Sequence, residues 1–128
     1  MRGKGRGRKR GWGRGRRAAW FIEPFLLLLL DQGAAHGYTL LDQLRELGLE
    51  QRNPSALYRS LRDMEALGYV TSTWDEEQTQ GPPRRVYQLT PMGTETLQHH
   101  AHMLNETQAL INHFLQLYQI QQQEKEKP

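Results

Sequence analysis

The sequence contains no cysteine. This absence excludes disulfide bonds, zinc sites built on thiolates and catalysis by a cysteine nucleophile, and it is compatible with a reducing compartment. Hydrophobic residues are also scarce, at 37% of the 128 residues, and the mean hydropathy is −0.80. A core built from so few apolar residues is thin, and burial against a second subunit would help to stabilise it. The length accommodates one compact domain with an extension.

The chain also lacks an apolar run long enough to cross a membrane. The longest run, residues 25–30, has six residues, whereas a membrane-spanning helix needs about 20. The basic start followed by this run loosely imitates a secretory signal, but Glu23 and Pro24 interrupt the apolar stretch and Asp31 ends it. We therefore expect a cytoplasmic protein, associated with the nucleoid and without a membrane segment.

Positive charge is concentrated at one end of the chain. Residues 1–17 hold nine of the 17 Lys and Arg, interspersed with glycine, and no Asp or Glu. The remaining 111 residues carry 8 basic and 14 acidic side chains, a net charge of −6, so the pI of 9.4 does not describe the body of the protein. Because glycine and charge repulsion oppose the formation of a core, we expect residues 1–17 to be a disordered basic arm.

Residues 18–31 predict a buried helix, with Pro24 near its start or at a break. Five consecutive leucines leave no polar face, so we expect this helix to be covered on more than one side, including by a second subunit. A core strand is the alternative, but leucine favours helix and no β-branched residue lies between positions 25 and 31. Three aromatic residues are candidates for a hydrophobic or aromatic effector pocket, although core packing is their more ordinary role: Trp20, Phe21 and Phe25.

Two further helices are predicted after a turn at residues 31–36. The first covers residues 37–47 and ends at Gly48, with an apolar face of Tyr38, Leu40, Leu41 and Leu44. Asn53 and Pro54 form the cap and first position of the next helix, which ends at Gly68. Its apolar stripe follows helical spacing and comprises Leu57, Leu61, Met64 and Leu67.

The remaining pattern is a hairpin followed by a long helix. Residues 69–74 and 85–89 predict strands joined by a loop, and Thr90 and Pro91 begin a helix over residues 91–120 that precedes a polar tail at 121–128. Apolar residues recur in this helix every seven positions, which predicts packing against a partner helix rather than against its own domain. The expected dimer interface comprises Leu97, Leu104, Leu110, Ile111, Leu115 and Tyr118.

This order of elements predicts a mainly α fold with a small β-hairpin. Residues 18–90 have the layout of a winged helix-turn-helix domain, and residues 91–120 would be a C-terminal dimerisation helix. The helix after Pro54 presents a polar face opposite its apolar stripe, as a helix that enters the major groove requires. A solvated basic face is the alternative, and Asp63 and Glu65 reduce its positive charge. The candidate DNA-binding residues on this helix are Ser55, Tyr58, Arg59 and Arg62.

The hairpin loop adds two candidates, Arg84 and Arg85, directly after Gly81, Pro82 and Pro83. Proline lowers the entropy that a loop loses when it docks, so a stiffened loop that carries arginines suits contact with phosphates or a minor groove. Exposed arginines on an ordinary hairpin are the alternative explanation.

Three segments in order resemble the signatures of the PadR-like family: the HGYxL at 36–40, the LYxxLxxMExxGYV at 57–70, and the GPPRxxYxLTxxG at 81–93. The resemblance implies a winged helix-turn-helix dimer that binds a pseudo-palindromic DNA operator, usually as a repressor. It also implies that the last helix makes the dimer with help from the first helix. By position, Tyr58, the polar face around it and Arg84 would contact DNA.

The sequence therefore favours a DNA-binding transcriptional regulator, a repressor that a small-molecule effector releases. General nucleic-acid or RNA binding led by the basic arm is the main alternative, and a sensor or interaction dimer that keeps only the fold is another. We expect no enzymatic activity, because no nucleophile, carboxylate pair or phosphate loop is recognisable. No cofactor or metal is expected either, because the histidines lack partners at ligand spacing: His99, His100, His102 and His113.

Overall fold

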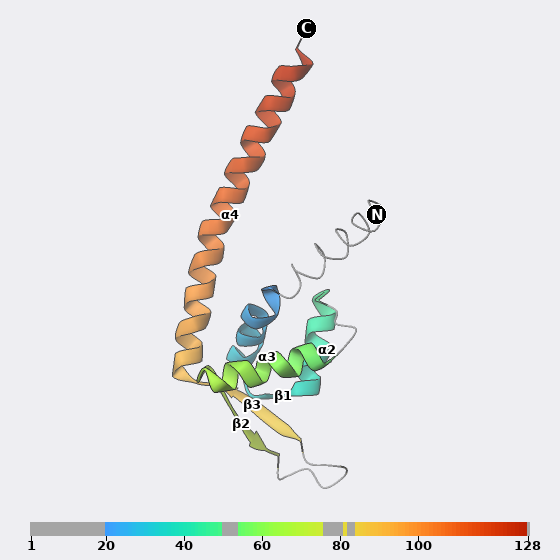
Figure 1. The fold of residues 1–128 in the computed structure, drawn as a ribbon, viewed down its shortest axis with the longest axis vertical. Coiled ribbons are helices and arrows are strands. Elements are labelled where there is room, and N and C mark those ends of the chain that lie inside the picture. Colours follow the sequence, from blue (N-terminus) through green and yellow to red (C-terminus); the bar gives the residue numbers. More distant parts are fainter. Residues whose placement is uncertain (1–19, 50–53, 76–80, 82–83, 128) are drawn as a thin grey trace, which may run out of the picture. The chain divides into compact units, whose positions relative to one another are not determined.

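The computed structural model describes residues 20–49, 54–75, 81 and 84–127 (Figure 1). The chain divides into two compact units, with the boundary between Leu97 and Gln98. The described part is mostly helical and contains one three-stranded antiparallel sheet. This architecture confirms the expected mainly α fold with a β-hairpin. The expected basic arm, residues 1–17, lies outside the described residues.

The first described element is an unbroken helix at residues 20–31, so Pro24 lies within it without a break. Its inward side chains form part of the hydrophobic core and are almost completely buried: Ile22, Leu26, Leu27 and Leu30. Leu28 is 48% exposed and Phe25 is half-buried. A single chain therefore covers most, but not all, of this apolar helix.

Helix α2 (Gly37–Glu46) buries Leu40, Leu41 and Leu44 in the same core. The expectation that Tyr38 also faces the core is wrong, because its side chain is 45% exposed. Tyr38 lies in the first turn of α2, directly after strand β1 (Ala35–His36). Its ring stacks there on His36 with 5.2 Å between ring centroids, so it packs on polar partners instead of the apolar ones.

Helix α3 (Ser55–Ala66) buries three apolar residues completely or almost so: Leu57, Leu61 and Met64. Burial of one such side chain contributes about 2 kcal/mol to folding. Leu67, expected in this stripe, is instead 56% exposed because the chain leaves the helix at Gly68, whose φ is 86°. The amide of Tyr69 then donates to the carbonyl of Met64 at 2.8 Å, which closes the helix end. Asn53, the expected cap, lies outside the described residues.

The sheet has the order β1-β3-β2, with β2 at Val70–Trp74 and β3 at Arg85–Leu89 (Figure 1). The two longer strands confirm the predicted hairpin, here called the wing together with its loop. Strand β1 lies where the sequence predicted a turn. The strand was not predicted because two residues are too few to show an alternating pattern. In the central strand β3, Tyr87 pairs with Ser72 on one side and Ala35 on the other.

Helix α4 (Pro91–Glu126) begins at the predicted cap. The Thr90 hydroxyl accepts a hydrogen bond from the Gly93 amide at 3.0 Å and donates to the Gly68 carbonyl at 2.6 Å. Gly93 is buried, and a Cβ at this position would collide with the Tyr69 carbonyl oxygen. The helix continues through residues 121–126, which were expected to be a polar tail.

Candidate nucleic-acid interface

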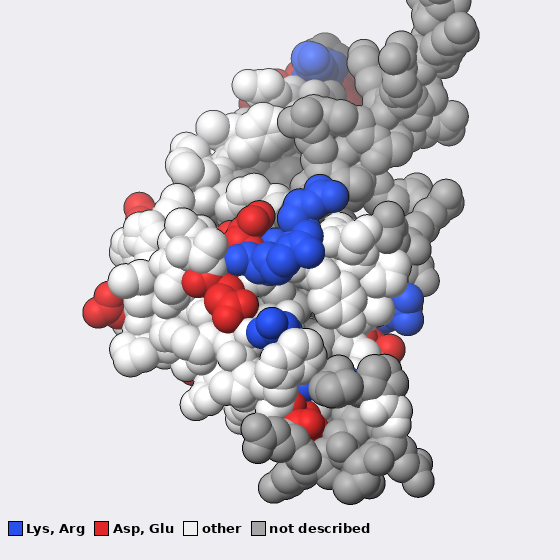
Figure 2. Space-filling model, turned by 60° about the horizontal axis from the view of Figure 1, so that its bottom comes forward, with Lys and Arg blue, Asp and Glu red and all other residues white. Residues whose placement is uncertain are grey.

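The two sides of α3 differ in burial as the sequence predicted. Leu57, Leu61 and Met64 face the core, whereas the side chains expected to contact DNA are all exposed: Ser55, Tyr58, Arg59 and Arg62. In Figure 2, basic side chains gather on the face of the molecule that lies at the bottom of Figure 1, with acidic side chains beside them. This face therefore combines positive charge with a helix whose other side is anchored in the core.

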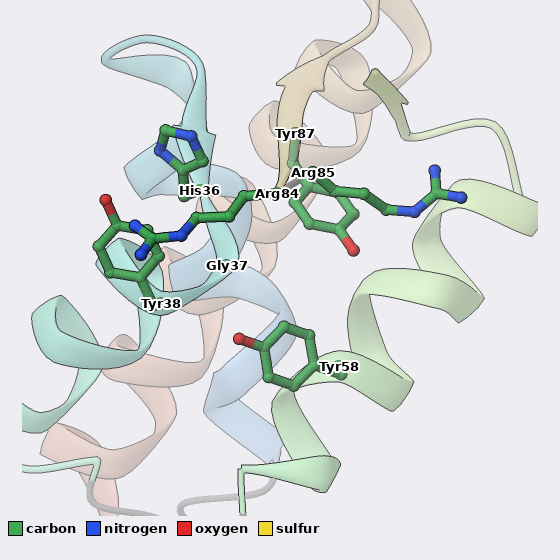
Figure 3. Close-up of a pocket in the computed structure, with 7 residues that line it drawn as sticks. All are labelled: His36, Gly37, Tyr38, Tyr58, Arg84, Arg85 and Tyr87. Carbon is green, nitrogen blue, oxygen red and sulfur yellow. The ribbon is translucent and has the colours of Figure 1, made fainter. Parts of the chain in front are cut away.

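The two wing arginines occupy different positions (Figure 3). Arg84 lies over the Tyr38 ring, with 4.6 Å from its guanidinium carbon to the ring centroid. Arg85 extends in the other direction, where it lies 4.4 Å from the Trp74 ring centroid and donates to the Ser72 hydroxyl at 2.8 Å. A guanidinium over an aromatic face is held by a cation–π attraction. Of the two, Arg84 therefore connects the wing to α2.

Arg85 takes part in a short chain of polar contacts that reaches α3. The Ser72 hydroxyl that accepts from Arg85 donates in turn to the Glu65 carboxylate at 2.9 Å. Arg85 and Trp74 are cross-strand partners, so their side chains share one face of the sheet with Ser72. These contacts fix Arg85 to the wing and the wing to α3, a structural role that the sequence did not reveal.

A pocket of about 490 Å³ lies between α2, α3 and β3. Figure 3 shows its lining side chains arranged around an open centre. They are His36, Gly37, Tyr38, Tyr58, Arg84, Arg85 and Tyr87. Three of the six residues expected to contact DNA, namely Tyr58, Arg84 and Arg85, are thus brought together in one pocket.

One wall of the pocket depends on a close approach between α2 and α3. A Cβ built on Gly37 would lie 2.6 Å from Cε1 of Tyr58 and 3.2 Å from its hydroxyl oxygen. Only glycine therefore lets the Tyr58 ring lie against the first residue of α2. In the sequence Gly37 is recognisable only as a motif residue at the start of a helix, and this contact with Tyr58 is not.

His36, in the edge strand β1, contacts Asp75 at the base of the wing. Its Nε2 lies 2.9 Å from a carboxylate oxygen of Asp75, and both side chains are 24% exposed. Asp75 therefore brings an acidic group next to the pocket, in contact with one of the lining residues. The link joins β1 to the residue that follows β2, which are 39 positions apart in sequence.

Tyr87 forms the most enclosed part of the pocket. It is 5% exposed, and its cross-strand neighbours are the small residues Ala35 and Ser72. Burial raises the pKa of its phenol above the usual 10.0, with the nearby Arg85 acting in the opposite direction. The hydroxyl consequently stays protonated at neutral pH and can donate a hydrogen bond.

The candidate effector residues form an aromatic row on the helix at residues 20–31. Trp20 and Phe21 meet edge to face with 4.9 Å between centroids, and Phe21 and Phe25 are 6.1 Å apart. Trp20 is exposed, and the other two are half-buried. None of the three lines the pocket at α2, α3 and β3, so their role stays a prediction.

The second unit consists of the continuation of α4 and has a largely exposed apolar side. Leu110 is 70% exposed and Phe114 is 66% exposed. Of the other expected interface residues, Leu104 is half-buried, whereas Ile111, Leu115 and Tyr118 are exposed. Leu97 belongs to the first unit, where it packs against the core. On the same helix, His102 pairs with Glu106 at 2.8 Å.

The family comparison matches residues 26–99 to the family described as "Transcriptional regulator PadR-like family". This match covers more than half of the chain, from the leucine run through both strands to the start of α4. The chain belongs to the PadR-like family. Membership identifies a transcriptional regulator and not an enzyme. A search of curated proteins finds no match.

Solved structures of other transcriptional regulators are similar to this fold. A PadR family transcription regulator from Clostridium difficile R20291 is 26% identical with a TM-score of 0.67, and the match covers 74% of this chain and 98% of that one. A transcriptional regulator from Clostridium thermocellum is 26% identical with a TM-score of 0.64, covering 73% and 89%. PadR of Bacillus subtilis, solved in complex with operator DNA, is 25% identical with a TM-score of 0.55, covering 61% and 45%.

The site contains residues that the sequence analysis missed or misplaced. His36, Tyr38 and Tyr87 were noted only as motif letters or core residues, yet all three line the pocket. The available signal was their spacing within the family motifs, but spacing alone does not show that β1, α2 and β3 meet. Within the described residues, no helix has the length and apolarity needed to span a membrane.

Proposed function

We propose that this regulator binds a specific sequence of double-stranded DNA through the exposed face of α3. The observation that carries the proposal is the two-sided character of this helix. One side of α3 is buried in the core through Leu57, Leu61 and Met64. The other side is exposed and carries Arg59 and Arg62. A helix held in this way presents its cations in a fixed register, which direct reading of base edges requires.

The wing and the relatives support the same proposal. Arg84 and Arg85 line the pocket that Tyr58 of α3 also lines, so two cations of the wing lie beside this helix. The Bacillus subtilis relative was solved with operator DNA. We infer that α3 enters the major groove and that the wing contacts the adjacent backbone, with Arg84 better placed for it than the fixed Arg85.

We further propose that the protein acts as a homodimer through α4 and the helix at residues 20–31. A contiguous patch of exposed apolar residues of this extent is unusual on a monomer and marks a surface for association. In α4 they include Leu110, Ile111, Phe114, Leu115, Leu117 and Tyr118. The exposed Leu28 on the first described helix would add to the interface. A dimer would place two copies of α3 on a pseudo-palindromic operator.

As the family resemblance implies, we propose a cytoplasmic repressor whose DNA binding is released by a hydrophobic or aromatic effector. The aromatic row of Trp20, Phe21 and Phe25 is the candidate effector site, because these side chains are only partly covered within one chain. An effector bound there would act through the dimer, since the row lies outside the pocket beside α3.

The test is a binding titration with fluorescently labelled genomic DNA that the protein has selected. The double variant Arg59→Ala/Arg62→Ala should bind this duplex at least tenfold more weakly, because two charged contacts are lost. The matched control is Arg45→Ala, an exposed arginine at the opposite end of α2 from the pocket. It should bind like the unsubstituted protein.

Competition with RNA separates the proposal from general nucleic-acid binding. We expect unlabelled duplex of the selected sequence to displace the label far better than RNA of the same length. Equal displacement by RNA would contradict sequence-specific DNA binding. Unchanged affinity in the double variant would contradict the role of α3 and favour a module that keeps only the fold.

A further inference from the structure

The arginines of the proposed DNA-binding face differ in how strongly the chain holds them. Arg85 donates to the Ser72 hydroxyl at 2.8 Å, and its guanidinium carbon lies 4.4 Å from the centroid of the Trp74 ring. By contrast, Arg59 and Arg62 on α3 form no hydrogen bond or ion pair within the described residues. The wing therefore holds Arg85 in place, whereas the cations of α3 stay available to a ligand.

The contact with Arg85 continues to a carboxylate of α3. The Ser72 hydroxyl has one hydrogen, which it donates to the Glu65 carboxylate at 2.9 Å, so its oxygen accepts from Arg85. A hydroxyl that is polarised by a carboxylate is a stronger acceptor, so the two hydrogen bonds reinforce each other. Glu65 and Ser72 are both half-buried, and solvent therefore screens this carboxylate less than one on the open surface.

The register of the hairpin places these side chains on one face of the sheet. Trp74 is the cross-strand partner of Arg85, and Ser72, two positions away, is that of Tyr87. Burial raises the pKa of Tyr87, and the charges of Arg85 and Glu65 act on this pKa in opposite directions, so both lie near the phenol. Because Arg85 is exposed, its guanidinium can leave Ser72 for another acceptor while the strands stay paired.

We propose that Glu65 is a positioning residue that restrains Arg85 through Ser72 and thereby keeps this wing arginine from binding DNA. A backbone phosphate competes with Ser72 for the same guanidinium N–H groups, and Arg85 gives up its contacts with the wing to reach it. Contacts with phosphates carry no sequence information, so the restraint limits the part of the affinity that is independent of sequence. The inference rests on the DNA binding proposed above.

The test is the salt dependence of duplex binding by Glu65→Gln. Glutamine keeps the size of the side chain and an acceptor for Ser72 but removes the charge, which should release Arg85. Each additional phosphate that a cation neutralises steepens the slope of log K against log salt by about 0.9. We expect the variant to bind the selected duplex about tenfold more tightly at low salt, and its slope to be steeper by this amount for each bound subunit.

Asp63→Asn is the matched control, because Asp63 is exposed on the same helix and takes no part in the contacts with Arg85. It removes the same charge, so it measures the general gain from weaker repulsion of DNA. In an Arg85→Ala background, Glu65→Gln should have no larger effect than Asp63→Asn, because no arginine is left to release. Arg85→Ala by itself should bind the duplex like Arg45→Ala.

Thermal unfolding of each variant separates this role from a merely structural one. Loss of a structural contact would lower the melting temperature and weaken binding without a steeper slope. That result, or an equal steepening in the Arg85→Ala background, would overturn the proposal. If Glu65→Gln does not fold, Arg85→Ala decides, since a tenfold loss of affinity in that folded variant would show that Arg85 already binds DNA.

The outcomes also distinguish this inference from the function on which it rests. If the unsubstituted protein binds no duplex DNA, the proposed function fails. If it binds the selected duplex and Glu65→Gln behaves like Asp63→Asn, only the restraint on Arg85 fails.

Discussion

Gly37 and Tyr58 are in such close contact that a methyl group on Gly37 would lie 2.6 Å from the Tyr58 ring. The first residue of α2 therefore determines where a side chain of α3 lies, although the two are 21 positions apart in sequence. This relationship couples the proposed DNA-reading helix to the pocket at its side.

The substitution Gly37→Ala should weaken DNA binding and leave stability unchanged or slightly higher. Alanine is the better helix former by about 1 kcal/mol, and the exposed Tyr58 ring can move away from the new methyl group. Binding titrations and thermal unfolding measure the two effects. In a Tyr58→Ala background the effect of Gly37→Ala on binding should disappear, and an equal loss in both backgrounds would show that the methyl group acts elsewhere.

Gly93→Ala should destabilise the first unit by about 3 kcal/mol. The added Cβ would meet the Tyr69 carbonyl and Leu89 Cδ1, and the Tyr69 backbone cannot move away without strain. Chemical denaturation followed by circular dichroism gives the free energy of unfolding. Glu95→Ala, an exposed position on the same helix, should change it little. Equal stability of the two variants would refute the tight packing at the start of α4.

Paired charges on the apolar side of α4 should separate the subunits. Leu110→Asp/Phe114→Asp puts two carboxylates among exposed apolar residues that we propose to bury in the dimer. Light scattering after size-exclusion chromatography should show the mass of a monomer, whereas Gln116→Asp on the same helix should stay dimeric. A dimer that survives the double substitution would place the interface elsewhere.

Deletion of residues 1–17 should flatten the dependence of DNA affinity on salt and leave the preference for the operator unchanged. The segment carries nine cations and no acidic residue, and each phosphate neutralised changes the slope of log K against log salt by about 0.9. Titrations at several salt concentrations with both proteins measure the slopes. Identical slopes would show that the arm does not touch DNA.

The elements of this fold with strong local signals were predictable. Gly68 and Thr90 mark the end of α3 and the start of α4, and both act through backbone geometry or a cap that sequence alone specifies. The exposed cations of α3 followed from helical periodicity opposite Leu57 and Leu61. The two long strands were predictable as a hairpin, because residues 69–74 and 85–89 flank a loop that contains glycine and proline.

The pocket was not predictable, because its parts depend on tertiary contacts. The helical spacing of Tyr38 relative to the buried leucines predicts that it faces the core. Its ring instead contacts His36 and Arg84, and Arg84 comes close to it only because the sheet forms. Strand β1 has two residues and exists through its pairing with β3. The burial of Tyr87 follows from its central place between Ala35 and Ser72, a register that the hairpin alone does not fix.

Genome-wide selection of bound DNA fragments tests the central claim that the exposed face of α3 reads a DNA sequence. The unsubstituted protein should enrich a pseudo-palindromic sequence whose half-sites lie about one helical turn apart. Arg59→Ala/Arg62→Ala should lose this enrichment, and Arg45→Ala should retain it. No enriched sequence, or the same enrichment by the double variant, would contradict the account.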